Sequence, residues 1–122
     1  MKLCESTPVL RMLDVDKARE FYCDFLGFKV DFEHRFGDNF PLYMGITRDG
    51  CELHLSEHHG DASPGSYVRI RTEDVQALGE ELQDKDYKYA KPGIEETEWN
   101  TREVTVTDPS MNKLRFFERI DA

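Results

Sequence analysis

The sequence predicts an α+β fold in which two βαβββ modules form a curved mixed sheet with a cleft. Three observations support this prediction. Segments in which apolar and polar residues alternate, as they do in half-buried strands, recur along the chain. Two segments with apolar residues at helical spacing each follow the first strand of a series. The second half of the chain also repeats the first, with matching residues 60 or 61 positions apart.

The first module spans about residues 7–57 and contains one helix and four strands. Asp14 is suited to cap the start of the helix, and Gly27 is suited to end it. The expected elements are a strand at 8–12, the helix between these two residues, and strands at 28–33, 42–47 and 51–56. Residues 57–65 are rich in turn-forming residues, which indicates a connector between the modules.

The second module spans about residues 65–119 and closes with a hairpin. Apolar and polar residues alternate on both sides of the hairpin turn at 108–112, where Asp, Pro and Asn favour a reversal of the chain. The apolar residues of the hairpin are Val104, Val106, Leu114 and Phe116. The elements expected before it are a strand at 67–71, a helix opened by Thr72 or Asp74, a strand-like segment at 87–90 and a turn at 91–93.

Two pairs of matching segments indicate that the modules are copies of one unit. The Asp-Val pair at 14–15 precedes the first helix, and the same pair recurs at 74–75, 60 residues later. The Leu-His-Leu segment at 53–55 matches Leu-Arg-Phe at 114–116, at an offset of 61. Each helix should cover one face of its sheet, so the other faces would line the cleft. The side chains expected there are those of Arg11, His54, Tyr67, Arg69, Val104 or its neighbours, and Arg115.

Composition and charge limit the possible classes of function. The 122 residues suit a single domain, residues 1–122, and 39% hydrophobic with 34% charged residues is the profile of a soluble globular protein. A net charge of −9 argues against nucleic acids and anionic membranes as partners. No segment resembles a membrane span or a signal peptide. The three cysteines show no paired spacing, which favours reduced thiols and a cytoplasmic location.

Several short motifs resemble those of one protein family. They are Pro8-Val9-Leu10, Asp14-Val15, Glu20-Phe21-Tyr22, Leu26-Gly27-Phe28, Asp31-Phe32, Glu98-Trp99 and Asp108-Pro109. On these motifs, which extend over about residues 7–118, the chain resembles the vicinal oxygen chelate superfamily, which includes glyoxalase I, extradiol dioxygenases and the bleomycin resistance proteins. The motifs at 8–10, 31–32 and 98–99 place the resemblance nearest to the bleomycin resistance branch.

The resemblance also implies where an enzyme of this superfamily would hold a metal ion. The four ligand positions, typically His and Glu, correspond here to Thr7, His54, Tyr67 and Arg115. Only His54 is a competent ligand, since Thr and Tyr are poor ligands and a guanidinium cannot give up its proton. No metal and no other cofactor is therefore expected, unless the register is shifted by two residues. A metal group of His54, His58 and His59 is a rival interpretation that the expected strand and loop placement disfavours.

Candidate ligand-binding residues come from the resemblance and from side-chain alternation. The resemblance implies a drug groove in or near Asp31, Phe32, Ser56, Tyr67 and Trp99. Phe36 is a further aromatic residue that no helical stripe explains, and large aromatic faces stack on flat ligands. Alternation adds His54, Arg69 and Arg115. The carboxylate pairs at 80–81 and 95–96 are expected to be exposed charge, so no catalytic residue is assigned.

The sequence favours a binding protein over an enzyme. The expected function is metal-independent sequestration of a bleomycin-like antibiotic, or a similar flat small molecule, in an aromatic-lined cleft of a homodimer. The resemblance implies the homodimer, with Pro8 at a hinge where the first strand is exchanged between subunits. Two alternatives stay open: a metal-dependent lyase or dioxygenase, and a binding protein for an anionic metabolite, which inward-facing arginines would suit.

Overall fold

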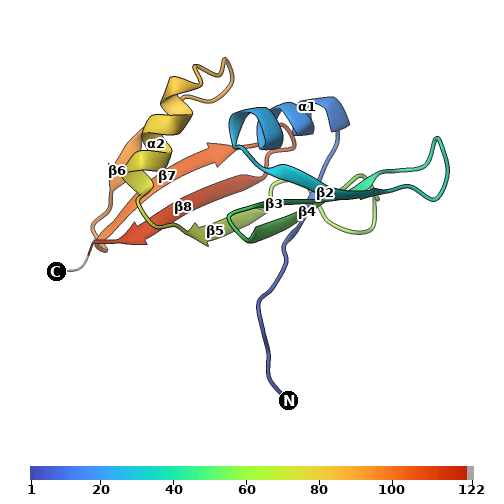
Figure 1. Cartoon of the computed structure of the whole chain (residues 1–122), viewed down its shortest axis with the longest axis horizontal. Helices are drawn as coiled ribbons and strands as arrows, with labels where there is room; N and C mark the ends of the chain where they lie inside the picture. Colours follow the sequence, from blue (N-terminus) through green and yellow to red (C-terminus); the bar gives the residue numbers. More distant parts are fainter. Residues whose placement is uncertain (121–122) are drawn as a thin grey trace. The chain divides into compact units, whose positions relative to one another are not determined.

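The structure is a computed structural model that describes residues 1–120. In it the chain folds into two βαβββ units. The first unit is Met1–Pro64, and the second begins at Gly65. In each unit a four-stranded mixed sheet carries one helical segment on one face and leaves its other face open (Figure 1). The predicted α+β class with two βαβββ modules is confirmed, whereas the cleft and the strand-exchanged dimer stay predictions.

Sheet A belongs to the first unit and has the strand order β1-β4-β3-β2. β1 runs parallel to β4, and the other neighbours are antiparallel. Its elements are β1 (Val9–Arg11), α1 (Val15–Arg19), the π-helical turn η1 (Glu20–Phe25), β2 (Lys29–His34), β3 (Tyr43–Arg48) and β4 (Cys51–Ser56). This order puts β4 beside β1, so that residues near the two ends of the unit share one face.

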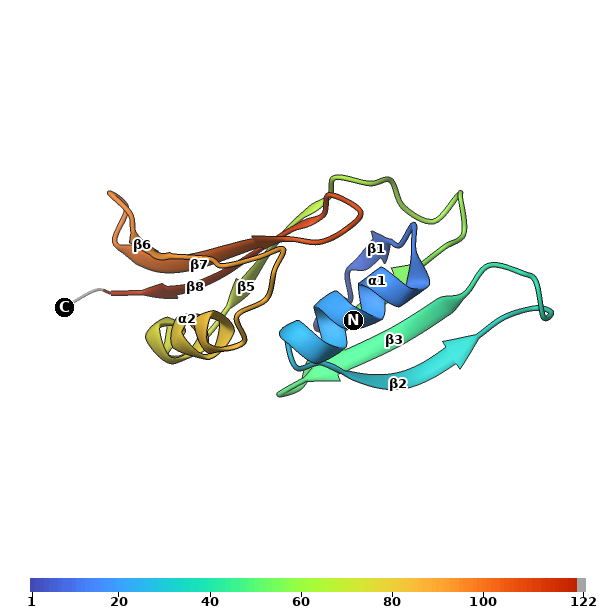
Figure 2. The same cartoon turned by 90° about the horizontal axis from the view of Figure 1, so that it is seen from above.

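Sheet B belongs to the second unit and repeats this arrangement in the order β5-β8-β7-β6. β5 is parallel to β8, and the remaining pairs are antiparallel. Its elements are β5 (Tyr67–Arg71), α2 (Val75–Asp84), β6 (Ile94–Glu96), β7 (Thr101–Thr107) and β8 (Lys113–Arg119). Figure 2 shows α2 on one face of this sheet, and Gly79 of α2 lies against Ile94 of β6 and Val104 of β7. Glu118 of β8 anchors the start of α2, because its carboxylate accepts hydrogen bonds from the backbone N–H groups of Asp74 and Val75.

The core of each unit lies between its helix and the helix-facing side of its sheet. Apolar residues that alternate along the strands are almost completely buried there, as the alternation predicts. In the first unit these strand residues include Leu10, Met44, Ile46, Leu53 and Leu55. In the second unit they are Val104, Val106, Leu114 and Phe116. The polar residues between them therefore point to the open face.

The first helix differs from the expected continuous α-helix. Asp14 caps it through a hydrogen bond to the backbone N–H of Lys17, as predicted, but the α-helix ends at Arg19 and a π-helical turn follows. In this wider turn the N–H of Leu26 bonds the carbonyl of Phe21, five residues earlier. Gly27 then ends the helical segment with a φ of +75°, a conformation that glycine adopts without strain.

The strand predicted at 87–90 is wrong, because the second strand of the second unit is β6, after the following turn. Residues 87–90 close a turn in which the N–H of Ala90 bonds the carbonyl of Tyr87. Ile94 is the residue that reaches the core: a Cβ on Gly79 of α2 would lie 2.5 Å from Cγ1 of Ile94. The apolar residue that fits under the helix therefore sets the position of the strand.

A hydrogen-bonded turn fixes the register of the closing hairpin. The Asp108 carboxylate accepts bonds from the backbone N–H groups of Ser110 and Asn112, both at 2.8 Å, and from the Asn112 amide at 2.9 Å. With this turn in place, Thr105 of β7 lies opposite Arg115 of β8. The turn predicted at 108–112 is confirmed, and it determines which side chains meet on the open face of sheet B.

Two features bear on the surroundings of the protein. Among residues 1–120 no helix has the length and apolar character needed to cross a membrane. Cys4, Cys23 and Cys51 are all free cysteines. Burial, together with the nearby carboxylates of Asp24 for Cys23 and Asp49 for Cys51, raises the pKa of both of these thiols.

Candidate ligand-binding site

The open face of sheet A carries an aromatic group built on β2, β3 and β4. Phe32 lies opposite Gly45, and its ring covers the space where a larger residue would place a Cβ. The Phe32 ring is stacked on Tyr43, with centroids 6.3 Å apart, and meets the His54 ring edge-on at 5.3 Å. Two of the predicted residues, Phe32 and His54, are thus brought together, and Phe32 remains 42% exposed as a flat apolar surface.

His54 is held by a neighbour that the sequence analysis missed. The Tyr43 hydroxyl lies 2.7 Å from Nδ1 of His54. On the other side of the ring, Nε2 lies 3.8 Å from the Glu52 carboxylate, which is beyond hydrogen-bonding distance. Among residues 1–120, Nε2 of His54 is a buried atom with no hydrogen-bond partner. Glu52 in turn accepts a hydrogen bond from the Thr7 hydroxyl at 3.3 Å.

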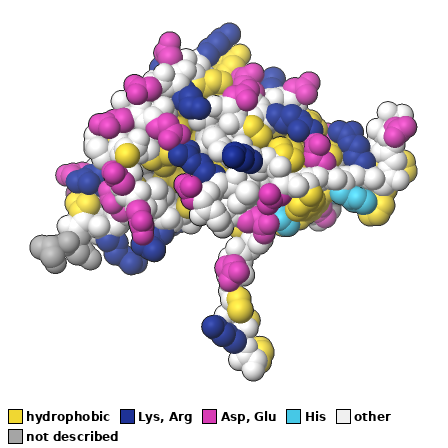
Figure 3. Space-filling view, in the orientation of Figure 1, with side chains coloured by type: hydrophobic (Ala, Val, Ile, Leu, Met, Phe, Trp, Pro, Cys, Tyr) yellow, Lys and Arg dark blue, Asp and Glu magenta, His cyan; other side chains and the backbone are white. Residues whose placement is uncertain are grey.

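The other three candidates of the first unit lie apart from this group. Phe36 is 74% exposed and meets the rings of His34 and His58 edge-on. Figure 3 shows histidine and hydrophobic side chains next to one another on the surface toward the β2–β3 hairpin. Asp31 is exposed at the point where the β2–β3 register shifts. The ligand-binding roles of Asp31 and Phe36 stay predictions.

Ser56 is placed differently from an open ligand-binding residue. It is completely buried, its hydroxyl donates to the Asp61 carboxylate at 2.6 Å, and it accepts from the N–H of His58 at 3.0 Å. These bonds join the end of β4 to the connector that follows it. The hydroxyl is therefore engaged within the protein in this structure, and a contact between Ser56 and a ligand stays a prediction.

The open face of sheet B is organised around Glu103, a residue that the sequence analysis missed. Its side chain is only 2% exposed. The carboxylate accepts hydrogen bonds from the Thr101 hydroxyl at 2.7 Å, Nη2 of Arg69 at 3.3 Å and the Trp99 indole N–H at 3.4 Å. Nε of Arg115 lies 3.4 Å from its other oxygen. Three predicted site residues therefore converge on this one carboxylate.

The donors around Glu103 keep it ionised. Burial raises the pKa of the Glu103 carboxyl, but the hydrogen bonds from Thr101, Trp99 and Arg69 and the charge of Arg69 outweigh that effect. The pKa therefore lies below its ordinary value of 4.5. At neutral pH one buried negative charge faces two guanidinium groups, which leaves the cluster with a surplus positive charge.

Tyr67 and Trp99 supply flat surfaces beside this charged cluster. Tyr67 is 52% exposed, and the Arg115 guanidinium lies 5.3 Å from the centre of its ring. Trp99 is 61% exposed, while its N–H is held by Glu103. Both rings are thus anchored through a charged neighbour and still present apolar surface to solvent. On the same face, the Arg69 guanidinium covers the Phe117 ring at 4.3 Å.

The four positions that would hold a metal ion in an enzyme of the family do not fit one here. Thr7 bonds Glu52, the Tyr67 ring packs with a guanidinium, and Arg115 places a permanent positive charge in a ligand position. Within residues 1–120, no three side chains of His, Cys, Asp or Glu come together as a possible metal-binding group. The rings of His54 and His58 contact different aromatic partners.

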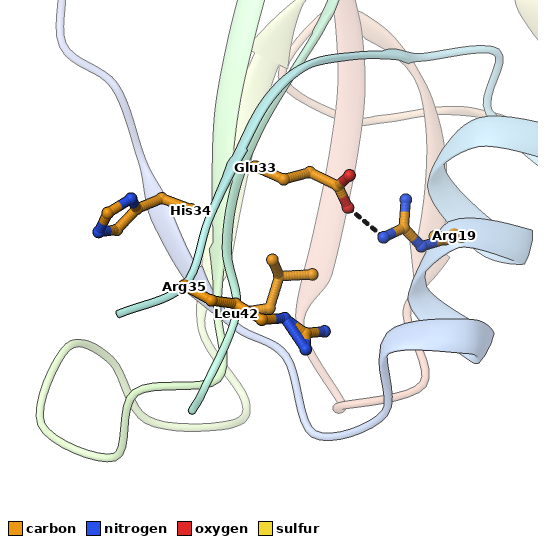
Figure 4. Close-up of a pocket in the computed structure, with 5 residues that line it drawn as sticks. All are labelled: Arg19, Glu33, His34, Arg35 and Leu42. Carbon is orange, nitrogen blue, oxygen red and sulfur yellow. Dashed lines mark hydrogen bonds and ion pairs between the residues drawn. The ribbon is translucent and has the colours of Figure 1, made fainter. Parts of the chain in front are cut away.

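A shallow pocket of about 330 Å³ lies on the other side of sheet A, next to α1. It is lined by Arg19, Glu33, His34, Arg35 and Leu42. Figure 4 shows Arg19 of α1 and Glu33 of β2 pointing toward one another, where they form an ion pair. This carboxylate and guanidinium neutralise each other, and the one aromatic ring among these lining residues is that of His34.

Glu103 and Tyr43 were not singled out by the sequence analysis, which expected Val104 or its neighbours on the open face. A Cβ on Gly79 would lie 3.4 Å from Cγ2 of Val104, so Val104 packs against α2. Its neighbours Glu103 and Thr105 face the open side. The position of Glu103 could have been predicted from strict alternation. If Val104 and Val106 are buried, residues 101, 103 and 105 must share the opposite face. Arg11, also expected to face inward, donates a hydrogen bond to the backbone carbonyl of Glu57.

Comparison with known proteins gives consistent similarities along the whole chain. Residues 2–122 match the family model described as glyoxalase superfamily protein. A bleomycin resistance protein from Geobacillus stearothermophilus is 26% identical over 133 residues, which cover 97% of this chain and 98% of that protein. The structure of a bleomycin-binding protein from Streptomyces verticillus, complexed with copper(II)-bleomycin, is 30% identical with a TM-score of 0.70, and the match covers 95% of this chain and 96% of that one.

A further solved structure extends the likeness of the fold. A glyoxalase-related enzyme from Clostridium phytofermentans gives a TM-score of 0.74 at 22% identity, and the match covers 98% of both chains. At this identity the likeness concerns the fold alone. Binding proteins and a glyoxalase-related enzyme therefore share this architecture, so that the side chains on the open faces have to distinguish between them.

Proposed function

The chain belongs to the glyoxalase superfamily, and from this premise we propose that it binds and sequesters a bleomycin-like antibiotic, or a similar flat small molecule, without transforming it. The observation that carries the proposal is the set of exposed aromatic rings on the open sheet faces. Phe32, Tyr67 and Trp99 are 42%, 52% and 61% exposed, although large aromatic residues of the core are 1–6% exposed. Exposed rings of this kind mark surfaces that bind another molecule.

These rings are held in place before any ligand arrives. Phe32 lies over Gly45 and against Tyr43, and the indole of Trp99 is tethered to Glu103. Rings that are already ordered lose little conformational entropy when a flat ligand stacks on them, which favours binding. This preorganisation supports the open faces as the binding surfaces.

Chemical considerations favour binding over catalysis. The raised pKa values of Cys23 and Cys51 keep these thiols protonated at neutral pH, so neither is an activated nucleophile. Glu103 has a lowered pKa, and its carboxylate already accepts three hydrogen bonds, which makes it a poor general base. A cation at the position of Arg115 disfavours a metal-assisted reaction. The relatives named as bleomycin resistance and bleomycin-binding proteins support bleomycin as the first ligand to test.

The proposal includes a homodimer in the cytoplasm. A second copy of the chain would cover part of the apolar surface that the open faces expose. The family resemblance supports the dimer, and the three free cysteines suit a reducing compartment. Sedimentation of the purified protein measures the first point. A monomer at all concentrations would remove the dimer from the proposal and leave the binding function to be judged separately.

A titration with metal-free bleomycin, followed through tryptophan fluorescence, tests the binding function. Trp99 is the single tryptophan of the chain, so any change in emission reports on this residue. The proposal predicts a saturable change with a one-to-one ratio of drug to subunit and recovery of the drug unaltered. Absence of a saturable change at micromolar drug contradicts it.

The metal content of the protein tests the competing enzyme interpretation. Protein purified without a chelator should contain far less than one equivalent of Ni, Zn, Fe or Mn per subunit. A near-stoichiometric metal would instead favour a metal-dependent lyase or dioxygenase. In that case His54, whose buried Nε2 has no hydrogen-bond partner among residues 1–120, would be the first ligand to replace.

A further inference from the structure

We propose that the open face of sheet B binds a carboxylate attached to a flat ring, with Arg115 and Arg69 holding the carboxylate and Tyr67 stacking on the ring. This inference rests on the proposed binding function and specifies the chemistry of the ligand. It implies that the part of the ligand over sheet B is anionic, although the whole protein has a net charge of −9.

The open face of sheet B carries a surplus of positive charge. Paired residues of neighbouring strands share a face, so the register of β5, β8, β7 and β6 identifies the side chains that point to the open side. The basic residues among them are Arg69, Arg71, Lys113, Arg115 and Arg119. Within these four strands, the acidic residues on the same face are Glu95 and Glu103. An acidic protein has therefore gathered positive charge on one sheet face, which attracts anions.

Arg69 and Arg115 share the single carboxylate of Glu103. One buried carboxylate cannot neutralise two guanidinium groups, so a unit of positive charge is left over at this point. The Arg69 and Arg115 side chains are 40% and 27% exposed, which makes them accessible from solvent. Glu103 also fixes their position, because its hydrogen bonds and its charge hold both side chains near one another.

Arg115 is held in an orientation that leaves part of its guanidinium available. Its Nε donates to the Thr105 hydroxyl at 2.9 Å and lies 3.4 Å from Glu103. The one hydrogen bond found for Arg115 among residues 1–120 starts from Nε, which leaves the Nη atoms for a ligand. A guanidinium can bind a planar carboxylate with two parallel hydrogen bonds. An ammonium group, which acts as a point charge, does not match the carboxylate in this way. Thr105 is thus a positioning residue for Arg115.

The ring of Tyr67 provides an aromatic surface next to these cations. The Tyr67 ring lies 5.3 Å from the Arg115 guanidinium and 6.0 Å from the Lys113 ammonium group, and half of it is exposed. A ligand that carries its carboxylate on or next to a flat ring can bind the guanidinium and stack on Tyr67 together. A cationic group in the same place would meet the positive charges of Arg69, Lys113 and Arg115 around Tyr67, and the nearby Glu103 carboxylate is already paired with both arginines. A cationic ligand should therefore be rejected.

Two probes with the same ring and opposite charge test this inference. Binding of 2-naphthoate and of 2-naphthylmethylammonium to the intact protein is measured by calorimetry at neutral pH, at low and at high salt. We expect the carboxylate to bind at least about tenfold more tightly than the ammonium compound, because charge-assisted pairing is lost in the second case. The preference should shrink at high salt, since these groups are partly exposed.

Three variants assign the preference to particular side chains. Arg115→Gln should weaken naphthoate binding about tenfold and remove most of the preference. Thr105→Val leaves every charge in place but removes the hydroxyl that orients Arg115, and it should weaken naphthoate binding severalfold. Lys17→Gln, an exposed residue on α1, changes the net charge as Arg115→Gln does and should leave binding unchanged. Circular dichroism and thermal unfolding verify that each variant is folded.

The outcomes separate this inference from the proposed function. Equal binding of the two probes, an unaffected Arg115→Gln variant, or a loss equally large in Lys17→Gln overturns the carboxylate site while leaving drug binding intact. If neither probe binds, the inference is also wrong, and the bleomycin titration alone then decides the proposed function. If bleomycin does not bind but naphthoate does, the antibiotic assignment fails and the anion site stands.

Discussion

The Phe32 ring lies directly over Gly45 on the open face of sheet A, where a Cβ on Gly45 would come within 2.2 Å of Cε1 of Phe32. The two residues are opposite one another on β2 and β3. A glycine in the middle of a strand weakens the strand, so its presence here indicates a close approach of another group. The ring fills that place and turns a strand position into an aromatic platform.

The substitution Gly45→Ala should displace this platform. A methyl group at this position cannot share space with the ring, so Phe32 has to leave Tyr43 and His54 or the strands have to separate. We expect the free energy of unfolding to fall by about 1–3 kcal/mol, as for other overpacked sites. Denaturant unfolding measures this loss, and the bleomycin titration should show weaker binding.

Gly60→Ala is the matched control for this prediction. Gly60 lies in the connector, where an added methyl group would have nothing within 4 Å of it, and its φ is not positive. The same methyl group should therefore cost little there. A Gly45→Ala variant as stable as Gly60→Ala, and with unchanged drug binding, would contradict the role assigned to the Phe32 platform.

Replacing Glu103 should expose how much the buried carboxylate contributes to stability. In Glu103→Gln the two guanidinium groups lose their shared charge, and the NH2 of the new amide has to face donors in either orientation: Thr101, Trp99 and Arg69 at one oxygen position, or Arg115 at the other. At neutral pH we expect a loss of about 2–3 kcal/mol in the free energy of unfolding. Glu95→Gln removes an exposed carboxylate from the same face and should change stability far less.

The stability difference between the wild type and Glu103→Gln should depend on pH, because the pKa of Glu103 is lowered in the folded protein. The folded protein binds the proton more weakly than the unfolded chain, so the stabilisation is complete above the ordinary pKa of 4.5 and is lost as the pH falls through the folded pKa. The gap in unfolding free energy between the wild type and Glu103→Gln should therefore be constant near neutrality and narrow below about pH 4.5. Urea unfolding at a series of pH values measures it, and a gap that widens in acid is incompatible with this account.

Most of the fold could be predicted from the sequence because strands and helices impose different periods on apolar residues. Leu53 and Leu55 alternate with His54, and the same pattern recurs at 114–116, which was enough to identify the repeat. The strand predicted at 87–90 failed for a tertiary reason. Tyr87 and Tyr89 look suited to a strand, but the contact of Ile94 with Gly79 places the strand later in the chain.

The candidate site could be predicted only in part, since alternation gives the face of a residue but not its partners. Arg69, Arg115 and Trp99 were identified singly, and the carboxylate that unites them was missed because Glu103 reads as an ordinary polar position of a hairpin. Ser56 shows the reverse case. Alternation predicted correctly on which face of its strand Ser56 lies. Its hydroxyl, however, bonds Asp61 of the connector, and no local pattern could have indicated this contact.

The substitution Met111→Gly should stabilise the turn of the closing hairpin. Met111 has a φ of +69° and a side chain that is 68% exposed, so its Cβ causes strain without a packing benefit that would offset it. We expect the free energy of unfolding to rise by up to about 1 kcal/mol, since the greater freedom of glycine in the unfolded chain offsets part of the gain.

Replacing Gly65 by alanine, the reverse kind of substitution, tests the same effect of a positive φ on backbone strain. Gly65 has a φ of +86° and open space around it, so Gly65→Ala should destabilise the protein through backbone strain alone. Thermal unfolding of both variants measures the two effects. If Met111→Gly lowers stability, Met111 must contribute contacts that outweigh the strain of its backbone.

Substitution of Trp99 should separate stacking from hydrogen bonding in ligand binding. Trp99→Phe keeps a flat ring but removes the N–H that donates to Glu103, whereas Trp99→Ala removes both. If stacking dominates, Trp99→Ala should weaken bleomycin binding about two- to tenfold, and Trp99→Phe should retain most of the affinity. Calorimetry replaces fluorescence here because both variants lack tryptophan.

Tyr89→Ala, which removes a ring that is 70% exposed between α2 and β6, is the control and should bind normally. Equal losses in both Trp99 variants would assign the effect to the hydrogen bond with Glu103. Loss of the proposed homodimer would assign Trp99 to the subunit interface.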